Sequence, residues 1–139
     1  MATIVVAAVT IRDDDGRVLT VRKRGTAMFM NPGGKPEPGE TMVDTAIREC
    51  AEELGITIEP GHLRELGRWH TATANEPDHD LDSTVFEYIG PLVSPVAAAE
   101  IAEIRWVPTS AIAGADLASE FAPLLISVVK SLQWADQSG

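Results

Sequence analysis

The sequence predicts an α/β layered domain with a mixed β-sheet, and three observations support this fold class. Several short runs rich in β-branched and apolar residues have the length of strands. Other segments carry apolar residues at helical spacing. Both kinds of segment occur in one chain of 139 residues with 45% hydrophobic composition, which suits one domain with a buried core. We therefore expect a single domain over residues 1–139, with helices packed on a mixed sheet.

The first two strand-like runs are Thr3–Ile11 and Val18–Arg24. They flank Asp13-Asp14-Asp15-Gly16, a composition typical of a tight turn. The two runs are therefore predicted to pair as a β-hairpin. A loop rich in proline and glycine follows from Asn31 to Gly39.

The segment Thr41–Leu54 is predicted to be an amphipathic helix. On a wheel of about 100° per residue, its apolar residues form one stripe: Val43, Ile47, Cys50 and Leu54. Gly55 follows where a left-handed residue commonly ends a helix, and Ile56 is placed to pack back on the last turn.

Three more strands are predicted in the second half of the chain. Leu63–Thr73 and Leu81–Ile89 are two strand-like runs joined by the polar loop Ala74–Asp80. Ile101–Val107 is a third, and Pro108 ends it because proline cannot donate a hydrogen bond to a strand ladder.

Two further helices complete the expected fold. Thr109 or Ser110 could cap a short helix after the last strand. A final helix would accept Pro123 as its first residue. Its buried side would consist of Leu124, Leu125, Val128, Val129 and Leu132.

The last turn of the helix Thr41–Leu54 carries three glutamates, Glu49, Glu52 and Glu53. A helix C-terminus favours cations, and like charges three or four residues apart repel each other, so this placement destabilises the helix. The carboxylates span an arc of roughly 100° beside the apolar stripe, so we expect them to be half sheltered. Such an arc suits Mg²⁺, which takes carboxylate oxygens, waters and phosphates. A solvated acidic face is the alternative interpretation.

Composition restricts the partners of the chain. A formal net charge of −10 argues against a nucleic-acid polymer or an anionic membrane as partner. The sequence has no charged leader and no apolar run of about 18 residues, so neither export nor membrane insertion is expected. The single cysteine excludes an internal disulfide and fits a cytoplasmic location. A small anionic substrate is compatible with this charge if metal ions and local basic residues reverse the field.

The most specific signal is the spacing between a Gly-Gly turn and the glutamates. Pro32-Gly33-Gly34-Lys35 precedes the helix, and Glu40 follows Gly34 after five residues. Seven residues later comes Arg48-Glu49-Cys50-Ala51-Glu52-Glu53-Leu54-Gly55-Ile56. Residues 34–56 resemble the Nudix box of the Nudix (MutT-like) hydrolases, with Cys50 at a position that asks for an apolar residue.

This resemblance implies an α/β/α sandwich that hydrolyses a nucleoside diphosphate linked to another group, with Mg²⁺ or Mn²⁺ as cofactor. By the same resemblance, Glu49, Glu52 and Glu53 would hold the metal together with the carbonyl of Gly33. Either Glu49 or Glu53 would act as general base on the attacking water.

Other box residues would support this centre. Arg48 and Glu40 would form an ion pair that orients the carboxylates. Gly34 and Gly55 would have structural roles at the turn and at the helix end.

Outside the box, several residues are candidates for substrate contacts: Arg22, Arg24, Lys35, Asn75 and Glu76. Strand alternation places Arg22 and Arg24 on one face and Lys23 on the other, so not all three can contact the same ligand. Solvated charge at a strand end is the alternative for this basic patch. Glu100 or Glu103 could add a base or a metal ligand, as a glutamate beyond the box sometimes does in this family.

The leading expectation for function is a pyrophosphohydrolase that acts on a small-molecule nucleotide, an intact or oxidised nucleoside triphosphate. ADP-ribose or a nucleoside diphosphate sugar is the alternative substrate. A non-catalytic, nucleotide-sensing Nudix module is an alternative of another class, and retention of all box glutamates argues against it. The resemblance also suggests a homodimer, since dimers are common in this family.

Overall fold

A four-stranded mixed sheet with the order β3-β1-β5-β4 forms the centre of the molecule. The computed structural model describes residues 2–75, 77–116 and 119–138, with side chains described as far as Leu132. β1 runs parallel to β5, whereas β3 and β4 pair antiparallel with their neighbours. The strands are β1 (Ala2–Thr10), β3 (Gly33–Gly34), β4 (Leu63–Ala72) and β5 (His79–Tyr88).

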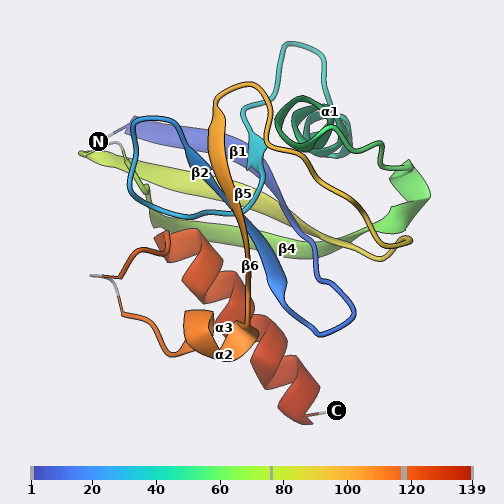
Figure 1. Cartoon of the computed structure of the whole chain (residues 1–139). Helices are drawn as coiled ribbons and strands as arrows, with labels where there is room; N and C mark the ends of the chain where they lie inside the picture. The colour runs from blue at the N-terminus through green and yellow to red at the C-terminus, as the bar shows by residue number, and fades with distance from the viewer. Residues whose placement is uncertain (1, 76, 117–118, 139) are drawn as a thin grey trace.

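A second, two-stranded antiparallel sheet consists of β2 (Val18–Lys23) and β6 (Ile101–Val107). The helices are α1 (Met42–Leu54), α2 (Thr109–Ala113) and α3 (Pro123–Ser138), and a 3₁₀ turn over Pro60–His62 precedes β4. Figure 1 shows α1 on one side of the four-stranded sheet and α3, with α2 beside it, on the other. The expected α/β/α layering with a mixed sheet is confirmed. None of the described helices is long and apolar enough to cross a membrane.

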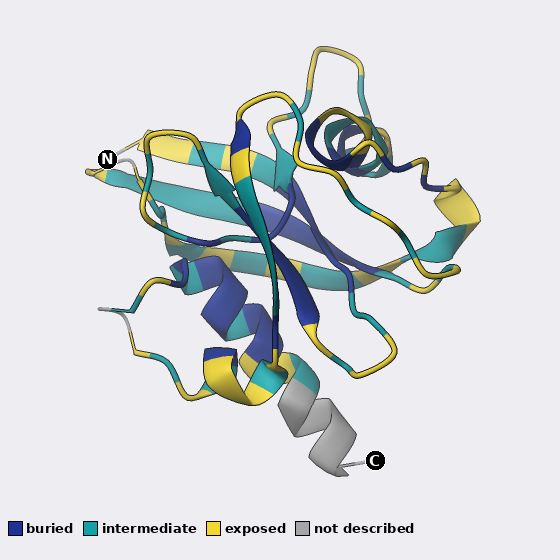
Figure 2. Ribbon diagram, viewed as in Figure 1, coloured by how far each residue is buried: buried dark blue, intermediate teal, exposed yellow. Residues whose placement is uncertain are grey.

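Strand alternation divides the core between the two helical layers (Figure 2). Ala7 and Val9 of β1 face the cluster under α1, which includes Ala46, Cys50 and Leu54. Ala8, between them, faces α3, where it packs with Val85, Leu124 and Val128. A third cluster joins the β2-β6 sheet to α2 and α3. The sheet therefore has buried residues on both faces.

Most predicted elements agree with the structure within one or two residues. Cys50 is buried in the predicted apolar stripe of α1, and Gly55 ends the helix with a φ of 66°. Ile56 packs into the same core cluster, as expected. α2 begins at Thr109 with Pro108 as its N-cap and no side-chain cap bond, so neither predicted hydroxyl caps that helix.

The predicted β-hairpin between the first two strands is wrong. β1 and β2 are joined beyond the turn by a single bridge, Arg12 to Val18, and by a bond from the N–H of Leu19 to the carbonyl of Ile11 at 2.8 Å. The strands then diverge into different sheets. The turn determines only that the chain reverses direction. Four successive β2 residues, Val18–Val21, are buried, so β2 must be packed against other elements on both of its faces.

Candidate active site

The Gly-Gly turn of β3 lies directly against the last turns of α1. The N–H of Gly33 donates to Oε1 of Glu53 at 3.0 Å, and Gly33 pairs in the sheet with Ala8. A Cβ at Gly34 would lie 2.4 Å from the carboxyl carbon of Glu49. The close approach of this carboxylate favours glycine at position 34, because a side chain there would displace the carboxyl group of Glu49.

Position 33 requires glycine for a second reason. Gly33 has a φ of 151°, and a Cβ there would lie 2.1 Å from the carbonyl oxygen of Ala7. The pair of glycines thus lets the β3 backbone pass between β1 and α1 without side chains intervening. This close packing is what brings backbone groups to the glutamate arc.

Glu53 is the most deeply buried of the three glutamates, with 2% of its surface exposed. Burial raises the pKa of its carboxyl to about 7, and the hydrogen bond from Gly33 opposes that shift. Burial also raises the pKa of Glu49, against the opposing effect of Arg48. Both shifts have the same cause, because a carboxylate removed from water is less stable in its charged form. The half-sheltered arc expected from the sequence is present, graded from buried Glu53 to exposed Glu52.

Arg48 connects the glutamates to the loop before the helix. Its Nε and Nη2 donate to the two carboxylate oxygens of Glu40 at 2.7 and 2.9 Å, a bidentate pair. Its Nη1 donates to Oε1 of Glu49 at 2.9 Å and to Oε2 of Glu52 at 3.4 Å. The pairing lowers the pKa of Glu40 to about 2. The expected ion pair is thus present, and it fixes the Glu49 carboxylate.

The donor set fits a hard divalent cation in its chemistry. Glu49 and Glu53 each use Oε1 in a hydrogen bond, and their Oε2 atoms accept none from the described residues. Two adjacent carboxylates whose charged forms are disfavoured by burial are stabilised by a cation, which usually completes its shell with waters and phosphates. Among the described residues, no three His, Cys, Asp or Glu side chains converge as a preformed cage. These carboxylates would provide only part of the shell of a bound metal ion.

A pocket of about 370 Å³ adjoins these carboxylates. Its charged lining consists of Lys23, Lys35, Glu49 and Glu100, close to the Gly-Gly turn. The rest of its wall is mainly apolar and comes from β1, β5 and the start of α3: Ile4, Val6, Ala8, Leu81 and Leu124 among others. One cavity therefore combines a charged region with an apolar region.

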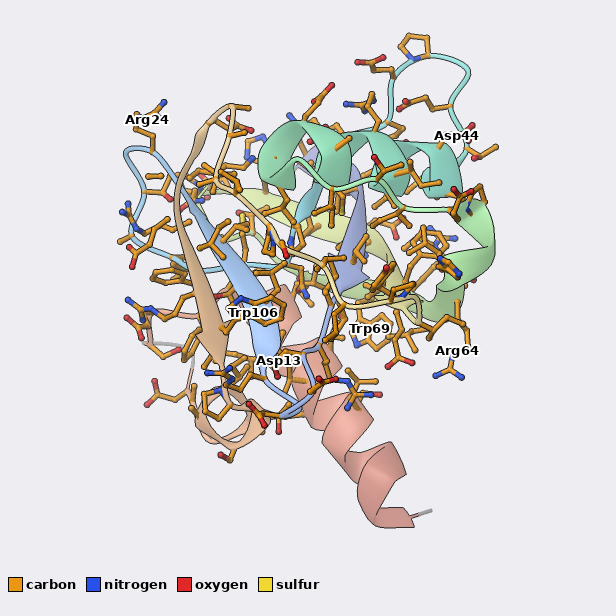
Figure 3. The ribbon with its side chains drawn as sticks, turned by 45° about the vertical axis from the view of Figure 1, so that its right-hand side comes forward. Asp13, Arg24, Asp44, Arg64, Trp69 and Trp106 are labelled. Atoms are coloured by element: carbon orange, nitrogen blue, oxygen red, sulfur yellow. The ribbon has the colours of Figure 1, made fainter. Side chains whose placement is uncertain are left out.

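Of the basic patch at the end of β2, Lys23 lines the pocket and the two arginines do not. Lys23 Nζ lies 3.4 Å from Oε1 of Glu100, a second pocket residue. Arg22 bonds instead to Glu103 at 3.2 Å, and Arg24 is exposed and points outward in Figure 3. Lys23 and the two arginines therefore have different surroundings, and the pocket lies on the side of Lys23.

The remaining candidates divide in the same way. Lys35 lines the pocket, and its carbonyl accepts a bond from Arg48 at 2.9 Å. Asn75 is exposed and is not part of the pocket lining, although Ala74 is. Glu76 lies outside the described residues.

Two residues of the pocket lining with polar side chains, Lys23 and Asn31, were not among the site residues predicted from the sequence. Alternation placed Lys23 on the face opposite Arg22 and Arg24, and no sequence signal identified which of the two faces lines the pocket. Asn31 adjoins the Gly-Gly turn in sequence, but an asparagine before proline is an ordinary loop residue.

Sequence comparison finds one family. A model of the NUDIX domain matches residues 1–127. Nudix hydrolase 3 of Caenorhabditis elegans is 37% identical over 76 residues, which cover 48% of this chain and 31% of that protein. Phosphatase NudJ of Escherichia coli (strain K12) is 37% identical over 57 residues, 40% of this chain and 37% of that protein. The matched part spans about a third of the length of these curated relatives.

Solved structures share the fold at low identity. The MutT protein from Methanosarcina mazei Go1 superposes with a TM-score of 0.80 at 20% identity, covering 97% of this chain and 96% of that chain. A C. elegans Ap4A hydrolase gives a TM-score of 0.69 at 20% identity, covering 96% and 99%. At such identities the likeness concerns the fold alone.

Proposed function

This chain belongs to the Nudix family, and on that basis we propose that it hydrolyses a phosphoanhydride bond of a small nucleotide with the help of divalent metal ions. The observation that carries the proposal is the contact of Glu49 and Glu53 with the Gly-Gly turn at the charged end of a pocket. The other end of the pocket is apolar and of a size that suits a nucleoside.

The metal would be held by Glu49, Glu52, Glu53 and the carbonyl of Gly33. When bound, Mg²⁺ or Mn²⁺ would neutralise charge on the phosphates, stabilise the leaving oxygen and lower the pKa of a water molecule. The protein itself must then supply preorganised charge and hold the substrate in position.

The residues of the chain have distinct tasks in this proposal. Glu53 or Glu49 accepts a proton from the attacking water, whose oxygen forms a new bond to phosphorus as the bridging P–O bond breaks. Arg48, anchored on Glu40, holds the Glu49 carboxylate in place. Lys23 and Lys35 lie where phosphates would enter, and their positive charge offsets the acidic surroundings.

We propose a nucleoside triphosphate, intact or oxidised, as the substrate, with the monophosphate and pyrophosphate as products. ADP-ribose and nucleoside diphosphate sugars are the alternatives. All of them place a nucleoside and a phosphoanhydride in one ligand, so the pocket accommodates the shared part. These candidate substrates differ in the group attached beyond the diphosphate.

The test is a hydrolysis screen with Mg²⁺ over dGTP, 8-oxo-dGTP, ADP-ribose, NADH and a nucleotide sugar. Pyrophosphate release from a triphosphate supports the proposal. Cleavage of ADP-ribose or of the nucleotide sugar instead would replace the proposed substrate class. Nucleotide binding without cleavage of any compound would contradict the hydrolase and support the sensing module.

The remaining expectations are proposals of the same kind. We propose a single Nudix domain over residues 1–139, located in the cytoplasm and assembled as a homodimer, with no nucleic-acid polymer or membrane as partner. Gel filtration with light scattering tests the dimer, because a mass of one chain at micromolar concentration would contradict it.

A further inference from the structure

The described part of the chain holds four side chains that contain sulfur: Met28, Met30, Met42 and Cys50. Of these four, Met30 lines the pocket, and the other three do not. Met30 is half-buried, and it also packs against the core cluster under α1. One thioether therefore lies between the core and the cavity in which a nucleotide would bind.

The backbone of Met30 is held on both sides of the residue. Its N–H donates to the carbonyl of Val21 at 2.9 Å, and its carbonyl accepts from the N–H of Val21 at the same distance. This antiparallel bridge attaches Met30 to β2. Two residues later, the carbonyl of Pro32 accepts from the N–H of Val9 at 2.9 Å. A chemical change at the sulfur must therefore be accommodated within the pocket wall.

A thioether reacts with hydrogen peroxide without activation by a neighbouring base. The sulfur attacks one peroxide oxygen with a lone pair, so that an S–O bond forms, the O–O bond breaks and the second oxygen leaves as water. The sulfur is oxidised by two electrons and the peroxide is reduced. The product is methionine sulfoxide, a polar side chain that methionine sulfoxide reductases convert back to methionine.

The other sulfur atoms of the described residues do not compete for this role. Cys50 is fully buried, and burial raises the pKa of its thiol, so the thiolate that reacts with peroxide is absent at neutral pH. Met28 and Met42 are half-buried, as Met30 is, but their oxidation would leave the pocket wall unchanged. The effect of peroxide on the pocket should therefore depend on Met30.

A sulfoxide at position 30 would disturb both surroundings of the side chain. Toward the core cluster, the new oxygen would face apolar side chains such as Val21 and Ile101, which offer it no donor. Toward the pocket, the oxygen would occupy part of the cavity beside an apolar wall. Both orientations oppose nucleotide binding, since the first loosens the wall and the second fills the space.

We propose that Met30 is a reversible oxidation site, at which a peroxide converts the thioether to a sulfoxide and thereby weakens nucleotide binding in the pocket. The effect on hydrolysis rests on the proposed function, whereas the modification and its reversal do not. A nucleotide bound in the pocket covers its wall and should therefore protect Met30 from the oxidant.

The test treats Mg²⁺-loaded wild type and Met30→Leu with hydrogen peroxide and follows dGTP hydrolysis, each protein being compared with its own untreated sample. Leucine has a similar volume and no sulfur. In the wild type, kcat/KM should fall by about 10-fold, the effect of one unsatisfied polar group. Met30→Leu should retain its untreated value. Peptide mass spectrometry should show one added oxygen at Met30, and methionine sulfoxide reductase should restore the activity of the wild type.

Two matched controls separate Met30 from the other methionines. Met28→Leu and Met42→Leu keep the thioether in the pocket, so peroxide should inactivate them as it inactivates the wild type. A dGTP analogue with an imido group between the α and β phosphates gives a second control. When bound, it should slow the oxidation of Met30 and leave the oxidation rates of Met28 and Met42 unchanged.

The proposal is overturned if peroxide inactivates Met30→Leu as it does the wild type, or if the inactivated wild type carries no oxygen at Met30. Removal of the sulfoxide without recovery of activity, or no protection by the bound analogue, would also overturn it. If the untreated wild type does not cleave dGTP, the proposed hydrolysis of this nucleotide fails, and its dissociation constant by calorimetry replaces kcat/KM. Affinity that peroxide lowers in the wild type and not in Met30→Leu then supports the oxidation site, and unchanged affinity refutes it.

Discussion

The two ends of α1 differ in how they are stabilised. At its N-terminus, Oγ1 of Thr41 accepts from the N–H of Asp44 at 3.1 Å, and the Asp44 carboxylate accepts from the N–H of Thr41 at 3.3 Å. This reciprocal capping box stabilises the helix with residues three apart. At its C-terminus, three glutamates oppose the helix dipole, and no basic residue occupies the last turn.

The two ends differ in the origin of the groups that stabilise them. The carboxylate of Glu53 is bonded by Gly33, which lies 20 residues earlier in the chain. Glu49 and Glu52 depend on Arg48, which is itself held by Glu40 from the preceding loop. The first end of the helix is therefore stable by itself, whereas the second is stable only within the folded protein. Such a local sacrifice of stability is expected at a functional site.

The sharpest test of this contrast is Glu53→Gln. We expect a loss of metal-dependent hydrolysis on the order of 100- to 1000-fold, the range for removal of one preorganised electrostatic group. The thermal midpoint of the metal-free protein at pH 8 should rise, because a buried charge is removed and the amide oxygen can still accept from Gly33. Pyrophosphate release and calorimetric unfolding are the two measurements.

Glu52→Gln is the control for that variant. The Glu52 side chain is 52% exposed, so its neutralisation should leave the midpoint almost unchanged. Full activity of Glu53→Gln on every substrate that the wild type accepts would refute the role of the box glutamates.

A second variant, Arg48→Lys, changes the residue that holds the glutamates at the C-terminal end of α1. Lysine keeps the charge but lacks the planar fork that holds Glu40 bidentately, so the Glu49 carboxylate loses its orientation. We expect kcat/KM to fall by about 10- to 100-fold, as for other groups that orient metal ligands. Circular dichroism should show an unchanged helix content. Wild-type kcat/KM in this variant would mean that the charge of Arg48 suffices.

A substitution at the N-terminal end of α1 should change the stability of the protein and leave its activity unchanged. Thr41→Ala removes the hydroxyl of the capping box and should lower the free energy of unfolding by about 1 kcal/mol. Because Thr41 is exposed and lies outside the pocket lining, kcat/KM should stay at the wild-type value. Urea titration and the hydrolysis assay together decide this, and a loss of activity without a loss of stability would contradict the division between the ends.

The smallest expected effect concerns pH. The hydrogen bonds from Arg48 lower the pKa of Glu40 from 4.5 to about 2, so the folded state is favoured by the ionised carboxylate. This contribution is fully present above pH 4.5 and is lost as the pH falls from 4.5 toward 2. The difference in unfolding free energy between wild type and Glu40→Gln should therefore shrink across that window. A difference that does not vary between pH 5 and pH 2 would exclude this linkage.

Local features of the fold could be predicted because neighbouring residues determine them. The periodicity of α1, its end at Gly55 and the burial of Cys50 follow from the helical repeat and the preference for a left-handed cap. The spacing of Gly34, Glu40 and the glutamates likewise indicates the family from the sequence alone. The grouping of Gly33 with Glu53 was expected from that resemblance, and their hydrogen bond is seen only in the structure.

The tertiary structure alone decided the pairing of β2 and the identity of the residues that face the pocket. The Asp-rich turn reverses the chain, but only burial on both faces of β2 places it beside β6 and away from β1. Alternation states that Lys23 and Arg22 lie on opposite faces, and it does not state which face meets a ligand. That choice, like the burial of Asn31, depends on contacts between segments far apart in the chain. Short-range patterns contain no information on those contacts, because the same residues satisfy their local preferences in either arrangement.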